Sequence, residues 1–321
     1  MSTSSVRIKQ ESISHIANPD PKYRELVQSF LSGRKEQTIK AYSQDLADFT
    51  EFLNQPSIAA TAQQLLSHGA GEANHSVLKY RIHLIERELS PATINRRLAA
   101  IRSLVRLANM LGIVTWEIKI TGVKVQPYRD TRGPGKQGFV ALLTQVRRKR
   151  TPKASRDYLA LRLLYDLALR ASEVVSLDMD DVDLTVGTVA VQGKGRSEKQ
   201  VLTMPEPTKQ AFHDWITKRG SEAGPVFLNF DRARKGQRLT SVSLYRIVRK
   251  IGESVGIKTR PHGLRHTAIT EACKAAQEHG FGLEEVLDFS RHSRNSISVL
   301  LLYRDRERNA QGQIASLVAV S

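Results

Sequence analysis

The sequence contains a single cysteine, Cys273, among 321 residues. An intramolecular disulfide and a cysteine-rich zinc site are therefore excluded, and a reducing compartment is the default expectation. No stretch contains the ~18 consecutive apolar residues that a transmembrane helix needs. The start of the chain, residues 1–14, is polar and mixed in charge, unlike a secretory signal. We therefore expect a cytoplasmic protein with no membrane partner.

Acidic residues are few compared with basic ones. The chain has 49 Lys and Arg against 32 Asp and Glu, and its formal net charge is +17. Such an excess of positive charge indicates a polyanionic partner, and double-stranded DNA is the one we expect, in a nucleoid-associated protein. Hydrophobic residues make up 40% of the chain, which excludes wholesale disorder, and the length suits two domains.

Motifs for metals and nucleotides are missing as well. The sequence has no HExxH, no Gly-rich Walker loop and no paired-carboxylate site. A magnesium-dependent nuclease or polymerase would need clustered Asp and Glu. The acidic residues at Asp178, Asp180, Asp181 and Asp183 fit a solvated turn before a strand. We therefore expect no metal and no other cofactor.

Apolar residues at helical spacing predict a helical core-binding domain over residues 20–119, preceded by a flexible arm, residues 1–19. Asp20-Pro21 begins one helix, Thr38 is expected to cap the next, and Ser90-Pro91 begins a later one. This later helix carries basic residues mainly outside its apolar stripe. We expect them to contact DNA, although a solvated charged face is the alternative. They are Arg96, Arg97, Arg102 and Arg106.

A basic, Gly- and Pro-rich linker over residues 120–137 leads into a second domain, residues 138–321, with a C-terminal tail. Helices are predicted at 139–149 and, from a cap at Ser155, to about 168. Apolar alternation then predicts short antiparallel strands at 182–184, 188–191 and 200–204. The fold class is therefore mainly α with a small antiparallel β-sheet. A helix predicted at 241–254 carries Arg246 and Arg249, which are further candidates for DNA contact.

The stretch Arg260-Pro261-His262-Gly263-Leu264-Arg265-His266 combines chemistry for binding and proton transfer. Pro261 and Gly263 predict a tight loop, followed by a helix over 268–276. Arg265 would lie near the start of that helix, and its planar fork matches two phosphate oxygens. His262 can exchange a proton near neutral pH. The alternative is a loop with a surface arginine and helix-capping histidines. We interpret His266 as structural.

The order Arg, Lys, His-x-x-Arg, His, Tyr resembles that of the tyrosine recombinases, the family of phage integrases and Xer-type resolvases. The resemblance covers nearly the whole chain. The matching motifs are Leu-Arg-Ala-Ser-Glu, Gly-Lys-Gly, His-Gly-Leu-Arg-His, Arg-His-Ser and Leu-Tyr-Arg-Asp, and they contain Arg170, Lys194, His262, Arg265, His292 and Tyr303. Two features depart from the family pattern. Arg291 stands where the family usually has glycine, and the spacing from His292 to Tyr303 is about two residues longer.

The resemblance implies a catalytic role for each matched residue. Tyr303 would attack the phosphorus and form a covalent 3′-phosphotyrosyl link to DNA. Arg170 and Arg265 would neutralise the phosphate oxygens without a metal. His262 would act as the base.

Three further residues would assist this reaction. Lys194 would protonate the departing 5′ oxygen. His292 would hydrogen-bond the phosphate. Glu173, close to Arg170 in the sequence, would orient a neighbouring group.

The function implied is site-specific recombination without ATP, by a homotetramer on DNA that exchanges strands through a Holliday junction. The free protein would be a monomer or weakly associated. A type IB topoisomerase-like enzyme and a non-catalytic DNA-binding regulator are the alternatives. The apolar run at 314–320 is expected to pack on a neighbouring protomer or on its own domain. Integration, excision and dimer resolution are not distinguished by the residues.

Overall fold

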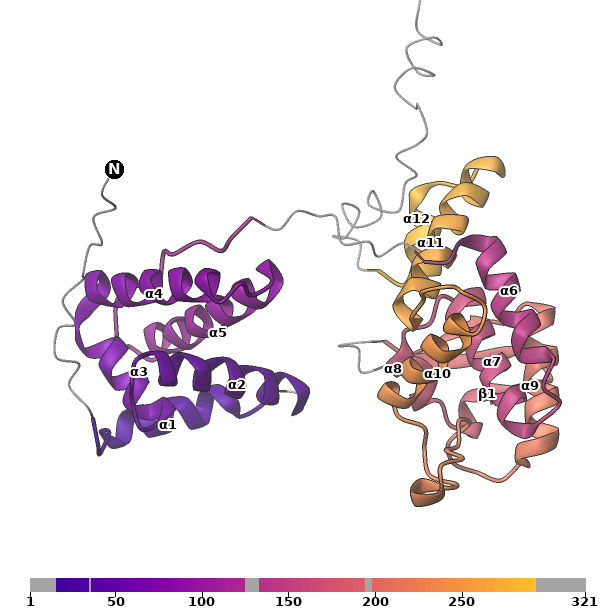
Figure 1. Cartoon of the computed structure of the whole chain (residues 1–321), viewed down its shortest axis with the longest axis horizontal. Helices are drawn as coiled ribbons and strands as arrows, with labels where there is room; N and C mark the ends of the chain where they lie inside the picture. Colours follow the sequence, from indigo (N-terminus) through magenta and orange to yellow (C-terminus); the bar gives the residue numbers. More distant parts are fainter. Residues whose placement is uncertain (1–15, 35, 125–132, 194–197, 293–321) are drawn as a thin grey trace, which may run out of the picture. The chain divides into compact units, whose positions relative to one another are not determined.

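The computed structural model of the chain describes residues 16–34, 36–124, 133–193 and 198–292 (Figure 1). Several predicted features lie outside these residues: most of the N-terminal arm, Lys194, Tyr303 and the apolar run at 314–320. The chain divides into two compact units between Pro127 and Tyr128.

The described part of the first unit is a helical bundle. Its helices are α1 (Pro21–Leu31), α2 (Glu36–Phe52), α3 (Ile58–Ser67), α4 (Gly69–Glu86) and α5 (Pro91–Met110). As predicted, α5 begins at Ser90-Pro91: the Ser90 hydroxyl accepts a hydrogen bond from the Thr93 backbone N–H at 3.3 Å. The apolar stripe of α5 packs against α1, α2 and α4 and buries Leu98 and Ile101 completely. The predicted cap at Thr38 is wrong, because α2 already begins at Glu36.

In the second unit, α7 is the central helix, and α6, α9 and α11 pack around it (Figure 1). Its burial follows from its sequence, since Leu159, Leu161 and Leu163 are fully buried and belong to the core of this unit. The helices are α6 (Gly135–Arg147), α7 (Pro152–Asp166), α8 (Ala171–Ser176), α9 (Glu206–Arg219), α10 (Ser241–Glu253), α11 (Pro261–Glu278) and α12 (Leu283–Ser290).

A small antiparallel sheet lies beside these helices, as predicted from the change from helical spacing to alternation of apolar residues. Its strands are β1 (Val182–Asp183), β2 (Thr188–Gln192) and β3 (Lys199–Thr203), in the order β1-β2-β3. Val189 pairs with Leu202 and, together with Val191, packs into the helical core. Gly187 makes the turn before β2 at φ 80°, a conformation that glycine adopts without steric cost. The predicted fold class, mainly α with a small antiparallel sheet, is confirmed.

Three helix starts in the second unit differ from their predictions. Helix α6 begins at Gly135 rather than at residue 139, so it starts inside the predicted linker, residues 120–137. Helix α7 begins at Pro152, where the Thr151 hydroxyl accepts a hydrogen bond from the Ala154 N–H at 3.2 Å, so Ser155 lies inside the helix. Helix α11 begins at Pro261, so the predicted tight loop is the first part of this helix. Proline suits the first position of a helix because its fixed φ is already helical and its missing N–H is not needed there. Gly263 lies inside α11, against Gly133.

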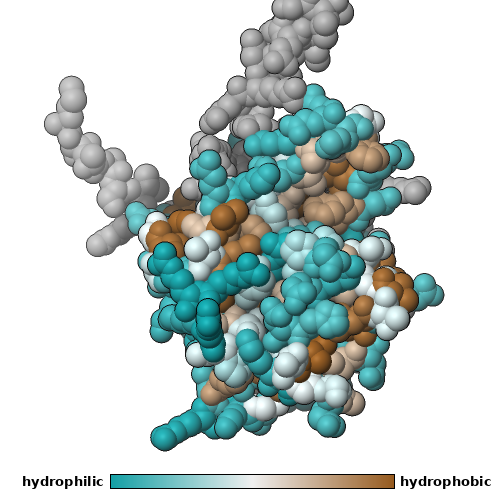
Figure 2. All heavy atoms as spheres, turned by 90° about the vertical axis from the view of Figure 1, so that its right-hand side faces the viewer, coloured by the Kyte–Doolittle hydropathy of each residue, from teal (hydrophilic) through white to brown (hydrophobic). Residues whose placement is uncertain are grey.

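The face of the second unit drawn in Figure 2 is mainly hydrophilic. In the view of Figure 2, apolar side chains form small, separate groups among polar ones. None of the helices in the described ranges is both long and apolar enough to cross a lipid bilayer.

We predict that Thr151→Ala destabilises the second unit by about 0.5–2 kcal/mol, because the Ala154 N–H loses its capping acceptor. Ser155→Ala is the matched control and should have a smaller effect, since the Ser155 hydroxyl caps no backbone N–H and accepts from the Lys218 side chain at the exposed surface. The measurement is urea unfolding followed by the fluorescence of buried Trp215 in a Trp116→Phe background, where Trp215 is the remaining tryptophan. A larger loss of stability for Ser155→Ala would contradict the assigned cap.

Candidate active site

Four chain segments of the second unit come together around a group of buried charges. They are the end of α7, the start of α8, the first part of α11 and the residues that end α12. We call Arg170, Arg265, Arg291 and Glu173 the arginine cluster. Its members contact one another directly or share a backbone carbonyl. The cluster places positively charged groups from distant parts of the sequence at one site.

Arg265 is deeply buried in α11, with 2% of its surface exposed. Its guanidinium donates hydrogen bonds to the backbone carbonyls of Ala168 and Ser290. Ala168 follows α7 in a left-handed conformation, with φ 46°. A planar guanidinium fixed by carbonyls on two segments has a defined orientation, which a flexible surface arginine lacks. The alternative interpretation of Arg265 as a surface arginine is therefore wrong.

Glu173 links two arginines through its carboxylate. Oε1 accepts a hydrogen bond from Arg170 Nη1 at 2.7 Å, and Oε2 accepts from the Arg170 backbone N–H and from Arg291 Nη2, each at 2.8 Å. Burial of Glu173, which is 3% exposed, acts to raise its pKa, but the charges of Arg291 and Arg170 and the hydrogen bonds from Arg170 outweigh it. The pKa of Glu173 is therefore lowered, and the carboxylate is ionised at neutral pH.

Two histidines complete the site. Loss of hydration lowers the pKa of His292 to about 4, and the positive charges of Arg265 and Arg170 act in the same direction. Its Nδ1 lies 2.9 Å from the Ser290 hydroxyl. The pKa of His262 is lowered first by loss of hydration and then by Arg260 and Arg265. Both imidazoles are therefore neutral near pH 7, and a neutral imidazole can accept a proton.

The site thus brings together Arg170, Glu173, His262, Arg265 and His292. His266 lies on α11 with its Nδ1 3.5 Å from the Thr270 hydroxyl. Sequence reasoning noted Arg291 only as a departure from the family pattern and missed its contacts with Glu173 and α7. The signal that could have found it is a charged residue at a position where glycine is usual.

The predicted DNA-contacting arginines of α5 lie in different environments. Arg96 pairs with Asp45 at 2.6 Å, and Arg97 pairs with Asp48 at 2.6 Å while only 15% of its side chain is exposed. Both ion pairs tie α5 to α2. Arg102 donates to the Ile120 carbonyl at 2.9 Å. Arg106 is the most exposed of the four, at 68%. The expected basic face is therefore partly directed into the first unit.

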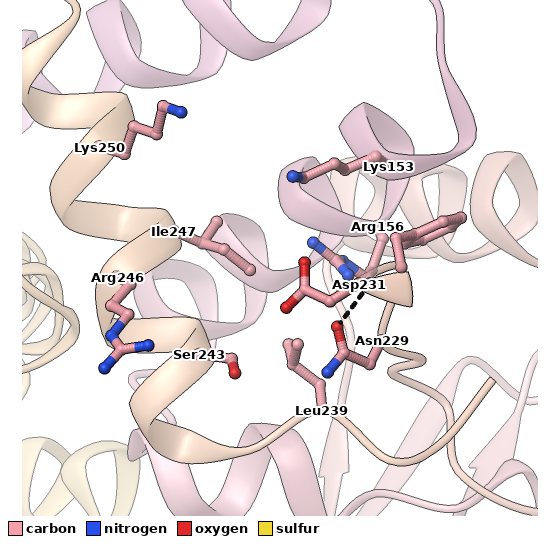
Figure 3. Close-up of a pocket in the computed structure, with 10 residues that line it drawn as sticks. Lys153, Arg156, Asn229, Asp231, Leu239, Ser243, Arg246, Ile247 and Lys250 are labelled. Carbon is pink, nitrogen blue, oxygen red and sulfur yellow. Dashed lines mark hydrogen bonds between the residues drawn. The ribbon is translucent and has the colours of Figure 1, made fainter. Parts of the chain in front are cut away.

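Helix α10 lines one side of a basic pocket, and the start of α7 lines the other together with Asn229 and Asp231 (Figure 3). Arg246 and Lys250 come from α10, and Lys153 comes from α7. Arg249 lies outside this pocket and pairs with Glu253 at 2.7 Å, with 62% of its side chain exposed. Across the described residues, no three or more His, Cys, Asp or Glu side chains form a group that could hold a metal ion.

Comparison with known proteins identifies the family. Residues 137–308 match the phage integrase family, and residues 27–110 match the SAM-like N-terminal domain of phage integrases. A tyrosine recombinase of Synechocystis sp. is 35% identical over 296 residues, which cover 89% of this chain and 91% of the relative. The chain belongs to the phage integrase family of tyrosine recombinases. The predicted family is therefore confirmed.

Other tyrosine recombinases are similar at greater distance. The XerC recombinase of Oceanobacillus iheyensis is 29% identical over 242 residues, which cover 73% of this chain and 75% of the relative. Two solved structures share the fold. The Tn1549 transposon integrase in complex with transposon right end DNA has a TM-score of 0.67 at 16% identity and covers 92% of this chain and 98% of its own. The XerH recombinase bound to its palindromic difH substrate has a TM-score of 0.65 at 17% identity, and the match covers 92% of this chain and 84% of the XerH chain.

We predict that His292 of this tyrosine recombinase stays neutral down to about pH 4, because loss of hydration and the cluster cations disfavour its protonation. Arg170→Gln should raise the pKa of His292, since it removes one of these charges. The measurement is an NMR titration of labelled histidines, with His292→Asn to assign the signal. A wild-type midpoint near the ordinary value of about 6.5 would contradict the assigned environment.

The lowered pKa of His292 makes the free energy of unfolding depend on pH. The unfolded chain binds the His292 proton more readily than the folded chain, so folding should become less stable as pH falls from about 6.5 to about 4. His292→Asn should reduce this loss, measured as the urea midpoint at each pH.

Proposed function

We propose that this protein is a site-specific DNA recombinase that cuts and rejoins DNA through a covalent 3′-phosphotyrosyl intermediate on Tyr303. The observation that supports this most is the arginine cluster with its two neutral histidines. It offers oriented guanidinium groups and a proton acceptor at one site. The family membership of the chain supports the same reaction class.

In the first step, the Tyr303 hydroxyl oxygen attacks the scissile phosphorus. Its proton passes to His262, which can accept it because its pKa is lowered and the ring is neutral at pH 7. The bond between phosphorus and the 5′ oxygen breaks as the bond to the tyrosine forms, and Lys194 donates a proton to the leaving oxygen. Rejoining reverses these steps with a 5′ hydroxyl as the nucleophile. The phosphotyrosyl bond replaces the phosphodiester, so no ATP is needed.

Arg170 and Arg265 stabilise the negative charge that develops on the nonbridging oxygens. Their guanidinium groups are already oriented before DNA binds, by Glu173 and by backbone carbonyls. Pre-oriented donors stabilise a transition state more than mobile ones because they need little reorganisation. In the tautomer whose Nδ1 accepts from the Ser290 hydroxyl, the Nε2–H of His292 donates a hydrogen bond to the same phosphate. These groups carry out the reaction without a metal or another cofactor.

The partner we propose is double-stranded DNA that carries a specific recombination site. Four protomers would assemble on two such sites and exchange strands through a Holliday junction, while the free protein would be a monomer or weakly associated. The net charge of +17 supports a nucleoid-associated location. The DNA-bound transposon integrase and XerH share the fold of this chain and support the choice of partner.

Contacts with the DNA backbone would come from both units. We assign them first to exposed cations: Arg106 on α5, and Arg246 and Lys250 beside the basic pocket. Arg96, Arg102 and Arg249 are exposed or partly exposed and supply further contacts. Arg97 contributes less, because it is largely buried and paired with Asp48.

The reaction is tested by covalent capture of DNA. We expect wild-type protein to become covalently attached to members of a pool of randomised, nicked duplexes, detected on a denaturing gel. Tyr303→Phe should give no adduct. Arg265→Ala should lower the cleavage rate by about 10²–10³-fold while DNA binding persists, because one preorganised donor is lost. A wild-type protein that binds DNA but forms no adduct would support the regulator alternative and refute the proposed reaction.

The DNA contacts are tested by the salt dependence of binding. Arg106→Ala and Arg246→Ala should each weaken binding and reduce the slope of log K against log salt by about one, since each removes a phosphate contact. Arg97→Ala is the contrasting variant: it should change the slope little and instead lower the stability of the first unit by breaking the pair with Asp48. Fluorescence anisotropy on a captured duplex provides the measurement, and unchanged slopes for both exposed arginines would rule out their contacts.

A further inference from the structure

Arg291 occupies a position that suits glycine in backbone geometry. It follows α12 with φ 52° and ψ 37°, in the left-handed region. This conformation costs a residue with a Cβ roughly 1–2 kcal/mol, and helix ends commonly place glycine there. An arginine here therefore needs contacts that offset the backbone cost.

The side chain of Arg291 makes such contacts inside the protein. It is 8% exposed, and its guanidinium donates to the Leu167 carbonyl at 2.7 Å and to the Ala168 carbonyl at 3.0 Å. The same guanidinium donates to Glu173 Oε2 at 2.8 Å. These acceptors belong to the end of α7 and to α8, more than a hundred residues away in sequence. Arg291 therefore fastens the end of α12 to both helices.

The contacts of Arg291 coincide with those that hold the two phosphate-binding arginines. Glu173, which accepts from Arg291, also accepts from Arg170. The Ala168 carbonyl, which accepts from Arg291, also accepts from Arg265. Movement of Arg291 would therefore displace the acceptors that hold Arg170 and Arg265, namely Glu173 and the Ala168 carbonyl.

We propose that Arg291 is a positioning residue for strand cleavage: it fixes Glu173 and the Ala168 carbonyl, and through them orients Arg170 and Arg265 toward the scissile phosphate. This inference rests on the proposed function. The Nη groups of Arg291 donate to Leu167, Ala168 and Glu173 in the protein interior, so we assign it a supporting role and not a phosphate-binding one.

The contact between Arg291 and Glu173 is an ion pair and is therefore stronger than a hydrogen bond between neutral groups. Glu173 is buried, and a buried carboxylate needs cations and donors nearby to remain ionised. Arg170 from α8 and Arg291 from the end of α12 are the cations in contact with it. Without Arg291, the carboxylate would keep Arg170 and lose the cation whose charge contributes most to lowering its pKa.

The first test is Arg291→Gly, which suits the backbone conformation and removes the side chain. We expect single-turnover cleavage of a captured duplex to become about 10–100-fold slower, as for the loss of groups that orient functional ligands. The Kd for DNA should stay unchanged. Arg291→Lys keeps the positive charge but lacks the planar guanidinium, so it should recover part of the cleavage rate.

A double-mutant cycle tests whether Arg291 acts through Glu173. In a Glu173→Gln background, Arg291→Gly should slow cleavage far less than in the wild type, because the shared contact is already changed. The pH profile provides a second readout. Arg291→Gly should move the loss of activity at acidic pH to higher pH, since the pKa of Glu173 rises when Arg291 is removed. The same comparison in the Glu173→Gln background, where His262 and His292 still titrate, separates the contribution of Glu173 from theirs.

The outcomes separate the two proposals. If wild-type protein forms no adduct, the proposed function fails. If it forms one and Arg291→Gly cleaves as fast, the inference is overturned. Independent effects of Arg291→Gly and Glu173→Gln, with an unshifted pH profile, would also overturn it. If Arg291→Gly does not fold, as judged by its thermal unfolding, Arg291→Lys provides the same comparison. A Lys variant that matches the wild type in both rate and pH profile would then refute the role of the fork.

Discussion

The buried ion pairs of Glu173 are the interaction on which the candidate active site depends. One carboxylate binds Arg170, the N-cap residue of the helix that contains Glu173, and Arg291, at a sequence separation of 118. Charges removed from water must be paired, since an unpaired buried charge is strongly destabilising. The pairs therefore fasten the end of α12 to α8, and the Arg265 contacts with Ala168 and Ser290 add α7 and α11 to the same junction.

The clustered guanidinium groups lower the pKa values of the neighbouring histidines. Positive charges around His292 and His262 oppose their protonation, so both rings are neutral at pH 7. Among the described residues of the arginine cluster, the Glu173 carboxylate offsets only part of this positive charge, which leaves the site complementary to an anion. Arginine pairs well with phosphate oxygens, and the proposed substrate, a phosphodiester, is such an anion. The electrostatics that hold the fold together at this point are thus the same that favour the substrate.

Much of the fold follows from local patterns. Ser90-Pro91 and the stripe of Leu98 and Ile101 predicted α5, and the change to alternation predicted the sheet. The errors have local causes. At Pro261 and Gly263 the sequence favoured a loop, yet proline suits the first helical position. Five of the candidate catalytic-site residues fall into one site, whereas Lys194 and Tyr303 remain predictions outside the described residues.

Local sequence patterns predicted the family, the excess of positive charge, most helices and the candidate catalytic residues, because these depend on composition, motif order and spacing over a few residues. Which charges meet follows from long-range contacts, which the folded structure alone shows. It turned Arg97 of α5 toward Asp48 and brought Arg291 onto Glu173. Such contacts join residues far apart in the chain, and a local pattern around either partner does not specify the other. Burial then determines their effect, since a surface arginine is solvated and an interior one must find acceptors.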